Sequence, residues 1–350
     1  MDWLFRLRGE VPANFKIILQ VIGIAIILLI WYLLTMGENP IVAKLTLPSP
    51  GSVFLAYGEM LHENDLVQNT FRSIGLNIGG YLKAILWTLP IGFIIGLYPI
   101  FRGLFRNTID AVRFVPLAAC IGLFMLTYGT SIPMKENFLA FGIFIFLLPI
   151  VIQRIGGVKD VYLKTVYTLG ATDWQTIRTV YIPSVMSKLI DDIRILTAIS
   201  WTYIVVAETV NADEGGLGAL TYIARRQFQT DKLFGILILF ILIGFLQDRI
   251  FVRLDKELFP HKYQVKDAHK VKAADEEDLV SSVTGYAFQA LVWSLLAVYV
   301  ILFLNEFSGF LGDFKYLDFL FGKTCWSIHV VMLSIIGYKF WRIFRPRLKA

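Results

Sequence analysis

Polar and ionisable side chains interrupt one apolar run of the sequence in two groups. The first group opens the run and comprises Asp191, Asp192 and Arg194; the second lies further along and comprises Ser200, Tyr203 and Glu208. Charged groups inside a bilayer are costly, so they are usually paired or line a route for solutes. The first group is therefore either an ion-pair cluster at the membrane surface or a gate. The second is interpreted as the lining of a solute path, with the alternative that Glu208 is only an interfacial carboxylate.

The residue types do not indicate catalysis or metal binding. The four histidines are scattered, at His62, His261, His269 and His329, and no His/Cys cluster has the spacing of metal ligands. The sequence has no phosphate-binding loop of the G-x-x-x-x-G-K-[ST] kind, so we expect no ATP hydrolysis by this chain. We predict no catalytic residue, no metal site and no cofactor bound by this chain. An integral membrane enzyme would need clustered His, Asp or Ser side chains at bilayer depth.

Long apolar segments carry these residues. The 350-residue chain is 56% hydrophobic and only 17% charged, with a mean hydropathy of +0.64. Roughly 20 apolar residues cross a bilayer core, and backbone groups there must be bonded within the segment, which requires helices. We therefore predict an all-α polytopic membrane protein with eight spans. They lie near residues 16–35, 76–100, 113–129, 138–153, 188–209, 233–252, 284–304 and 325–341. The third and fourth are short, and Pro116 and Pro149 are candidate kinks in them.

The basic residues set the expected orientation. Lys and Arg concentrate in alternate loops, for example Arg102 and Arg106 in one and Lys159, Lys164 and Arg178 in the next. Because cytoplasmic loops carry an excess of Lys and Arg, both termini are predicted to be cytoplasmic. The net charge of +6 follows from this topology and from anionic lipid, so no nucleic-acid partner is expected. Lys83, within the second span, is expected to snorkel to the outer surface.

A polar interruption at residues 157–183 is predicted to form a cytoplasmic helix–turn–helix. The pattern of apolar residues favours a short helix over 159–169, followed by a left-handed turn at Gly170. Thr172 or Asp173 can cap a second helix that starts at Trp174, and Pro183 is expected to break it before the fifth span. The alternative is an ordinary amphipathic loop between two spans.

Four motifs together resemble one family. They are Leu169-Gly170-Ala171-Thr172-Asp173-Trp174 with the later Ile182-Pro183, Val205-Val206-Ala207-Glu208, Gly215-Gly216-Leu217-Gly218, and the turn Leu47-Pro48-Ser49-Pro50. The first resembles the coupling loop of ABC importer permeases, whose signature is EAA, three residues, Gly, nine residues and I-x-L-P. The set as a whole is similar to permeases of the nitrate/sulfonate/bicarbonate/taurine type, over roughly residues 40–263. Here the EAA positions hold Lys164, Thr165 and Val166, so the acidic residue is replaced by a basic one.

The resemblance implies a fold and a set of coupling residues. The fold would be the type I ABC importer transmembrane fold, with about six spans, plus about two additional C-terminal spans. The chain would divide into residues 1–36 (tail and first span), 37–263 (permease core with coupling segment 157–183), 264–282 (cytoplasmic linker) and 283–350 (extension). The residues expected to couple to an ATPase are Lys164, Thr165, Leu169, Gly170, Ala171, Thr172, Asp173, Trp174 and Pro183, with Trp174 and Pro183 anchoring the segment.

The resemblance also implies a function and partners. The chain would form the path for a small anionic solute, although relatives also carry neutral heterocyclic precursors. ABC ATPase subunits would hydrolyse ATP with Mg, and a periplasmic or lipid-anchored solute-binding protein would deliver the solute. A second permease copy would complete a homodimer in the lipid bilayer of a bacterial inner membrane. The alternative is an ion-coupled secondary transporter, which would be expected to show inverted repeats and midplane charges; neither is visible in the sequence.

Overall fold

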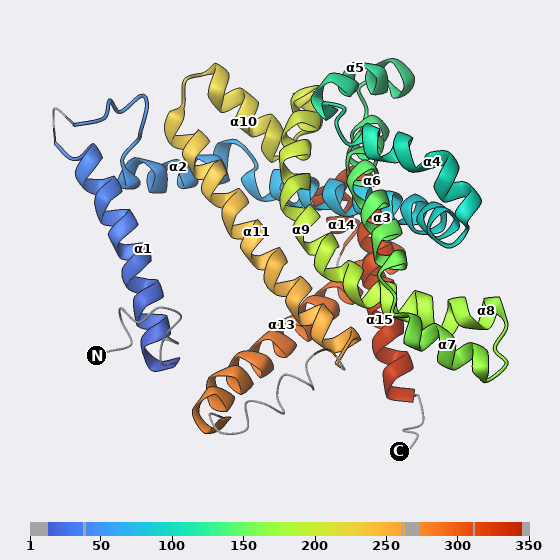
Figure 1. The fold of residues 1–350 in the computed structure, drawn as a ribbon. Helices are drawn as coiled ribbons and strands as arrows, with labels where there is room; N and C mark the ends of the chain where they lie inside the picture. The colour runs from blue at the N-terminus through green and yellow to red at the C-terminus, as the bar shows by residue number, and fades with distance from the viewer. Residues whose placement is uncertain (1–12, 38–39, 261, 263–273, 311, 345–350) are drawn as a thin grey trace.

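A computed structural model describes residues 13–37, 40–260, 262, 274–310 and 312–344. Its described residues form helices and no strand (Figure 1). The α-helices are α1 (Ala13–Thr35), α2 (Pro50–Glu63), α3 (Leu66–Leu97), α4 (Pro99–Val112), α5 (Leu117–Tyr128), α6 (Ile132–Gly156), α7 (Asp160–Thr168), α8 (Asp173–Thr176), α9 (Ile182–Thr209), α10 (Leu217–Arg226), α11 (Thr230–Leu258), α13 (Ala274–Ser308), α14 (Tyr316–Phe321) and α15 (Cys325–Phe344). Residues 264–273 of the predicted linker, with His261 and His269, lie outside the described residues, whereas 274–282 belong to α13.

The predicted fold class is confirmed. Among the described helices, α1, α3, α6, α11, α13 and α14–α15 supply six segments long and apolar enough to cross a membrane. Helix α9, the fifth predicted span, is also long enough at 28 residues. It falls outside that set because Lys188, Asp191, Asp192 and Arg194 all lie in its first half.

The third predicted span, at 113–129, is short and contains α5. The axes of α4 and α5 bend by 104° at the break between them, next to the proline predicted to kink this span. Pro116 lies in this break, in extended backbone, as the residue before α5. A proline cannot continue the helix that precedes it, because it lacks an N–H and its ring clashes with the turn before. Helix α5 has only 12 residues, so α4 and α5 must act together to return the chain across the bundle.

Helices α3 and α6 form the centre of the bundle and run side by side in the same direction. Glycines of α3 face bulky residues of α6: an added Cβ at Gly80 would lie 2.6 Å from Leu139, and one at Gly92 would lie 2.6 Å from Val151. Small residues let two helix backbones approach closely, which is how helices associate where lipid weakens the hydrophobic driving force. Leu139 and Val151 are both fully buried at this seam.

The segment at 157–183 lies at the same end of the molecule as the start of α1 and the end of α15 (Figure 1). Helices α2, α5 and α10 lie at the opposite end. We call these the inner and outer ends. This placement agrees with the predicted arrangement in which both termini and the 157–183 segment share one side of the membrane.

Residues 274–344, which form α13, α14 and α15 and which we call the C-terminal module, pack on α3. Ser327 Oγ donates a hydrogen bond to the carbonyl of Gly75 at 3.0 Å, and the rings of Phe71 and Phe321 meet edge to face at 5.2 Å. Gln68 Nε2 also donates to the carbonyl of Phe319 at 2.7 Å. Helices α14 and α15 therefore contact the central helix of the bundle directly, whereas α13, the first of the two predicted C-terminal spans, packs on α14 and α15.

A buried ion pair joins α3 and α6 to this module. Lys83 Nζ lies 2.5 Å from a carboxylate oxygen of Glu136, and the indole N–H of Trp326 donates to the other oxygen at 3.0 Å. Glu136 is almost completely buried. Lys83 was expected to snorkel to the outer surface; instead it pairs with a partner inside the bundle, because Glu136 supplies the opposite charge there.

Candidate coupling segment and polar interior

The segment at 157–183 has the local structure that its sequence predicts. Helix α7 spans Asp160–Thr168, and Gly170 follows with φ of +80°, in the region that other residues rarely adopt. Thr172 caps α8 through a capping box: its hydroxyl accepts from the N–H of Gln175 at 3.3 Å, and the Gln175 side chain accepts from the N–H of Thr172 at 2.8 Å. Of the two predicted caps, Thr172 is the one used.

The predicted break at Pro183 is wrong. The backbone stays helical from α8 through a π-helical turn, Ile177–Tyr181, directly into α9. Pro183 lies in the first turn of α9, where a missing N–H costs little. The wider π turn immediately upstream is a common way of inserting an irregularity without ending a helix. Helices α8 and α9 are therefore joined by continuous helical backbone.

The tip of this segment exposes apolar side chains, whereas its base is buried. Leu169 is 82% exposed and Trp174 67% exposed, while Thr176 and Val180 are buried. The expectation that Trp174 anchors the segment to its own bundle is wrong, since its side chain is exposed. Thr176 and Val180 are the buried residues at the base of the segment. Lys164 and Thr165 are exposed on α7, as is Asp173, whereas Ala171 is half-buried.

A hydrogen bond stiffens the tip from within. The Tyr167 hydroxyl of α7 donates to the Asp173 carboxylate of α8 at 3.0 Å. This bond raises the pKa of Tyr167 above its ordinary value, because only the protonated phenol can donate to the carboxylate. The two short helices are thus linked beyond the turn at Gly170.

Asp191, Asp192 and Arg194 form ion pairs with different neighbours at the inner end. Asp192 accepts two hydrogen bonds from the Arg154 guanidinium of α6, at 2.6 and 2.7 Å. Arg194 pairs with both oxygens of Asp248 on α11, one of them at 2.9 Å. Asp191 lies 3.3 Å from Lys262. The structure thus contains the ion-pair cluster, and these pairs tie the start of α9 to α6 and α11.

Ser200 and Glu208 are buried inside the protomer. Ser200 contacts the Asn77 side chain at 3.2 Å, and Glu208 accepts from the Ser73 hydroxyl and from the N–H of Gly218, both at 2.6 Å. The Val205–Glu208 and Gly215–Gly218 motifs therefore meet, since Glu208 binds the glycine turn. Tyr203 is half-buried, and the exposed side of α9 carries Ile195, Ile199 and Thr202. The lining role of Ser200, Tyr203 and Glu208 stays a prediction.

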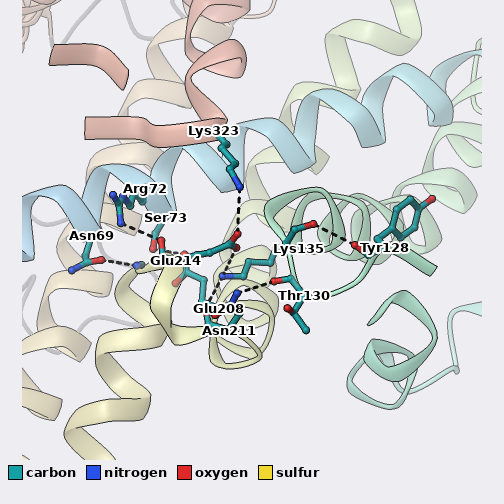
Figure 2. A network of polar contacts seen from close by, with 12 residues as sticks. Asn69, Arg72, Ser73, Tyr128, Thr130, Lys135, Glu208, Asn211, Glu214 and Lys323 are labelled. Carbon is teal, nitrogen blue, oxygen red and sulfur yellow. Dashed lines mark hydrogen bonds and ion pairs between the residues drawn. The ribbon is translucent and has the colours of Figure 1, made fainter. Parts of the chain in front are cut away.

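A polar network at the outer end was not found from the sequence. Lys135 of α6 is fully buried; its ammonium donates to the carbonyl of Asn211 at 2.9 Å and lies 3.2 Å from the Glu214 carboxylate (Figure 2). Arg72 of α3 donates to the carbonyl of Glu214 at 3.2 Å. The available signal was the pair of charges, Lys135 and Glu136, directly before the apolar run at 138–153.

Comparison with known proteins agrees with this architecture. Residues 88–260 match the family described as binding-protein-dependent transport system inner membrane component. The chain is also 30% identical over 210 residues to a putative aliphatic sulfonates transport permease protein of Escherichia coli (strain K12). This match covers 58% of this chain and 76% of that protein. The chain belongs to this family.

Two further relatives are informative about the permease. This chain is 25% identical over 269 residues to the taurine transport system permease protein of Escherichia coli (strain K12). The match covers 75% of this chain and 96% of the relative. The chain is also 27% identical over 191 residues to the riboflavin transport system permease protein of Chloroflexus aurantiacus. The match covers 54% of this chain and 70% of the relative. The family match ends at residue 260, so the C-terminal module of this permease lies beyond it. Within the described residues, no cluster of three His, Cys, Asp or Glu side chains could hold a metal ion.

Proposed function

We propose that this chain is the transmembrane permease subunit of an ATP-driven ABC importer, in which it forms the translocation path for a small anionic solute. The observation that carries the proposal is the coupling segment at 157–183. It extends from the inner end with an exposed apolar tip at Leu169 and Trp174, and it is helically continuous with α9. Exposed apolar side chains beside polar ones are typical of a protein interaction surface.

The proposed coupling follows from the rigidity of this connection. An ATPase subunit that moves the 157–183 segment would move the start of α9, because capped and packed helices move as units. Asp192 and Arg194 would pass that movement to α6 and α11 through their ion pairs. We assign the coupling role to the residues predicted for it, and a gating role to the Asp191, Asp192 and Arg194 cluster.

The partners follow from the same assignment. ABC ATPase subunits would hydrolyse ATP with Mg, and a periplasmic or lipid-anchored solute-binding protein would deliver the solute at the outer end. A second copy of this chain would complete the path in the bacterial inner membrane, with both termini cytoplasmic. Two exposed surfaces support a homodimer: the apolar window of α1, which is 6% buried, and the side of α9 that carries Ile195, Ile199 and Thr202. The half-buried Tyr203 lies next to this side of α9.

An anionic solute is supported by the relatives named for aliphatic sulfonates and taurine. The relative named for riboflavin leaves a heterocyclic precursor as the second candidate for the solute. An ion-coupled secondary transporter is the alternative mechanism, but it gives no role to an exposed helical tip at the inner end.

The decisive experiment tests association with an ATPase. The tagged chain is purified from membranes of its own host, and co-purifying ABC ATPase subunits are quantified by mass spectrometry and ATP hydrolysis. Leu169→Glu places a charge on the exposed tip and should abolish association. Phe228→Glu is the matched control, because Phe228 is 76% exposed near the outer end and should retain the ATPase.

Gly170 provides a second arm of this experiment. Gly170→Val forces a β-branched residue into a φ of +80° and should also abolish association, whereas Gly170→Asn should largely retain it, since Asn tolerates left-handed backbone. Equal ATPase recovery with all four variants, or none with the unmodified chain, would refute the proposed coupling role.

A further inference from the structure

A polar cavity of about 210 Å³ lies at the outer end between the permease core and the C-terminal module. Three cationic side chains line it, one from each of three elements: Arg72 of α3, Lys135 of α6, and Lys323 beside α14. Three carboxylates line it as well, those of Glu208, Asp213 and Glu214. The cavity is therefore charged on all sides but balanced in formal charge.

Glu214 lies between two of the cations. Its carboxylate is 3.2 Å from the ammonium of Lys135 and 3.9 Å from that of Lys323 (Figure 2). The oxygen facing Lys135 is buried, yet it makes no hydrogen bond of good geometry to any described residue. Glu214 is thus held by charge attraction rather than by directed bonds. Glu208, in contrast, accepts two short hydrogen bonds at 2.6 Å and is fixed.

The chain around Glu214 allows its side chain to leave. Glu214 ends a single 3-10 turn, Ala212–Glu214, and two glycines with positive φ follow it. The backbone is pinned nevertheless, because Arg72 binds the Glu214 carbonyl and the N–H of Gly216 donates to Asn69 at 2.7 Å. Rotation of the Glu214 side chain alone can therefore vacate the place between the two lysines without moving the loop.

We propose that this cavity is an anion-binding subsite of the permease, in which the Glu214 carboxylate occupies the place of a solute's carboxylate or sulfonate group. This rests on the proposed function and names the site that would receive the anion. An anion that replaces Glu214 between Lys135 and Lys323 leaves the charge balance of the cavity unchanged. A neutral solute would separate the buried Lys135 from Glu214 without replacing the lost negative charge, which is unfavourable, so the site discriminates by charge.

The C-terminal module supplies one of the two cations. Lys323 lies beyond the part of the chain that matches the family, and its side chain is 74% exposed at the rim, whereas Lys135 is fully buried. Lys323 is thus the first cation that an arriving anion meets, and Lys135 the deeper one. The module therefore adds a solute-binding charge to the permease core.

The test measures equilibrium binding of ethanesulfonate to the full chain in lipid nanodiscs by calorimetry, with ethyl methyl sulfone as the neutral isostere. Glu214→Gln removes the competing anion and keeps the shape, so ethanesulfonate should bind about tenfold more tightly, which corresponds to the loss of one charge-assisted contact. Lys323→Gln should weaken binding several-fold, and Lys323→Arg should restore it. Lys315→Gln, an exposed lysine directly before α14, is the matched control and should change nothing.

Three results would overturn the subsite: the same affinity with and without Glu214→Gln, an equal gain for the neutral sulfone, or an equal loss with Lys315→Gln. Lys323 is exposed, so its variants should fold even if changes around Glu214 disturb the loop. The outcome is independent of the ATPase experiment: if Leu169→Glu abolishes ATPase association while Glu214→Gln leaves the ethanesulfonate affinity unchanged, the permease assignment stands and the subsite fails.

Discussion

The ion pair between Asp192 and Arg154 gives the sharpest test of how α9 is connected to the bundle. Two consecutive aspartates at the start of α9 have very different surroundings. The Asp192 side chain is 10% exposed and accepts two hydrogen bonds from Arg154, whereas the Asp191 side chain is 57% exposed and lies 3.3 Å from Lys262. Replacing each by Asn removes one charge and changes almost no volume, so the two variants are matched.

The expected magnitudes follow from burial. Asp192→Asn weakens a bidentate charge-assisted pair and should cost about 1–3 kcal/mol. Asp191→Asn removes a solvent-screened pair and should cost about 0–1 kcal/mol. Since about 1.4 kcal/mol is a factor of ten in an equilibrium constant, Asp192→Asn should raise local opening in the first half of α9 by about 5- to 140-fold. Asp191→Asn should raise it by less than about fivefold by the same conversion.

Hydrogen exchange of the first half of α9 measures that opening, in the full chain in nanodiscs. In the assembled importer, Asp192→Asn should also raise the number of ATP molecules hydrolysed per solute molecule taken up. The reason is that the inner end of α9 would no longer be bonded firmly enough to α6 to move it. The double variant Asp192→Arg with Arg154→Asp should partly restore both readouts. Indistinguishable exchange and coupling for the Asp191 and Asp192 variants would refute the reasoning.

Three further perturbations test other contacts. Thr172→Ala removes the cap of α8 and should cost about 1 kcal/mol, seen as faster hydrogen exchange confined to the coupling segment. Gly75→Ala would place a Cβ against Thr324 and should destabilise the chain by about 1–3 kcal/mol in thermal unfolding, whereas Gly244→Ala, with open space around it, should be neutral or stabilising by up to about 1 kcal/mol. Trp326→Phe keeps the ring but loses the indole hydrogen bond to a buried carboxylate, so protease cleavage between α13 and α15 should accelerate while association with the ATPase is unchanged.

The elements that follow from short-range rules could be predicted from the sequence. The turn at Gly170 and the cap at Thr172 depend on a few neighbouring residues, and both are confirmed. Apolar length likewise identified the long helices. The prediction of a helix break at Pro183 was wrong because a proline in the first turn of a helix is compatible with a continuous helix when a π turn precedes it. At 113–129 the apolar residues located α5 and Pro116 marked the place of the bend, but neither revealed the 104° angle to α4.

The side of a helix that a polar residue occupies could not be read from the sequence. Helix α9 carries polar residues on several sides, so periodicity gave no reason to separate the buried Ser200 and Glu208 from the exposed Thr202. Their partners, Ser73 and Asn77, lie more than a hundred residues away on α3. Pairings between distant charges, such as Lys83 with Glu136, are likewise set by packing rather than by any local pattern.

The contacts of the C-terminal module restrict how α3 and α11 can move. Near the outer end, Trp326 binds the carboxylate that Lys83 neutralises, so the module holds α3 and α6 together. At the inner end, Lys339 of α15 lies 3.2 Å from Glu257 of α11. A single helix, α15, therefore bonds to the α3–α6 pair at one end and to α11 at the other. Any conformational change that separates α11 from α3 while α15 stays intact has to break one of these contacts, and both are largely shielded from solvent.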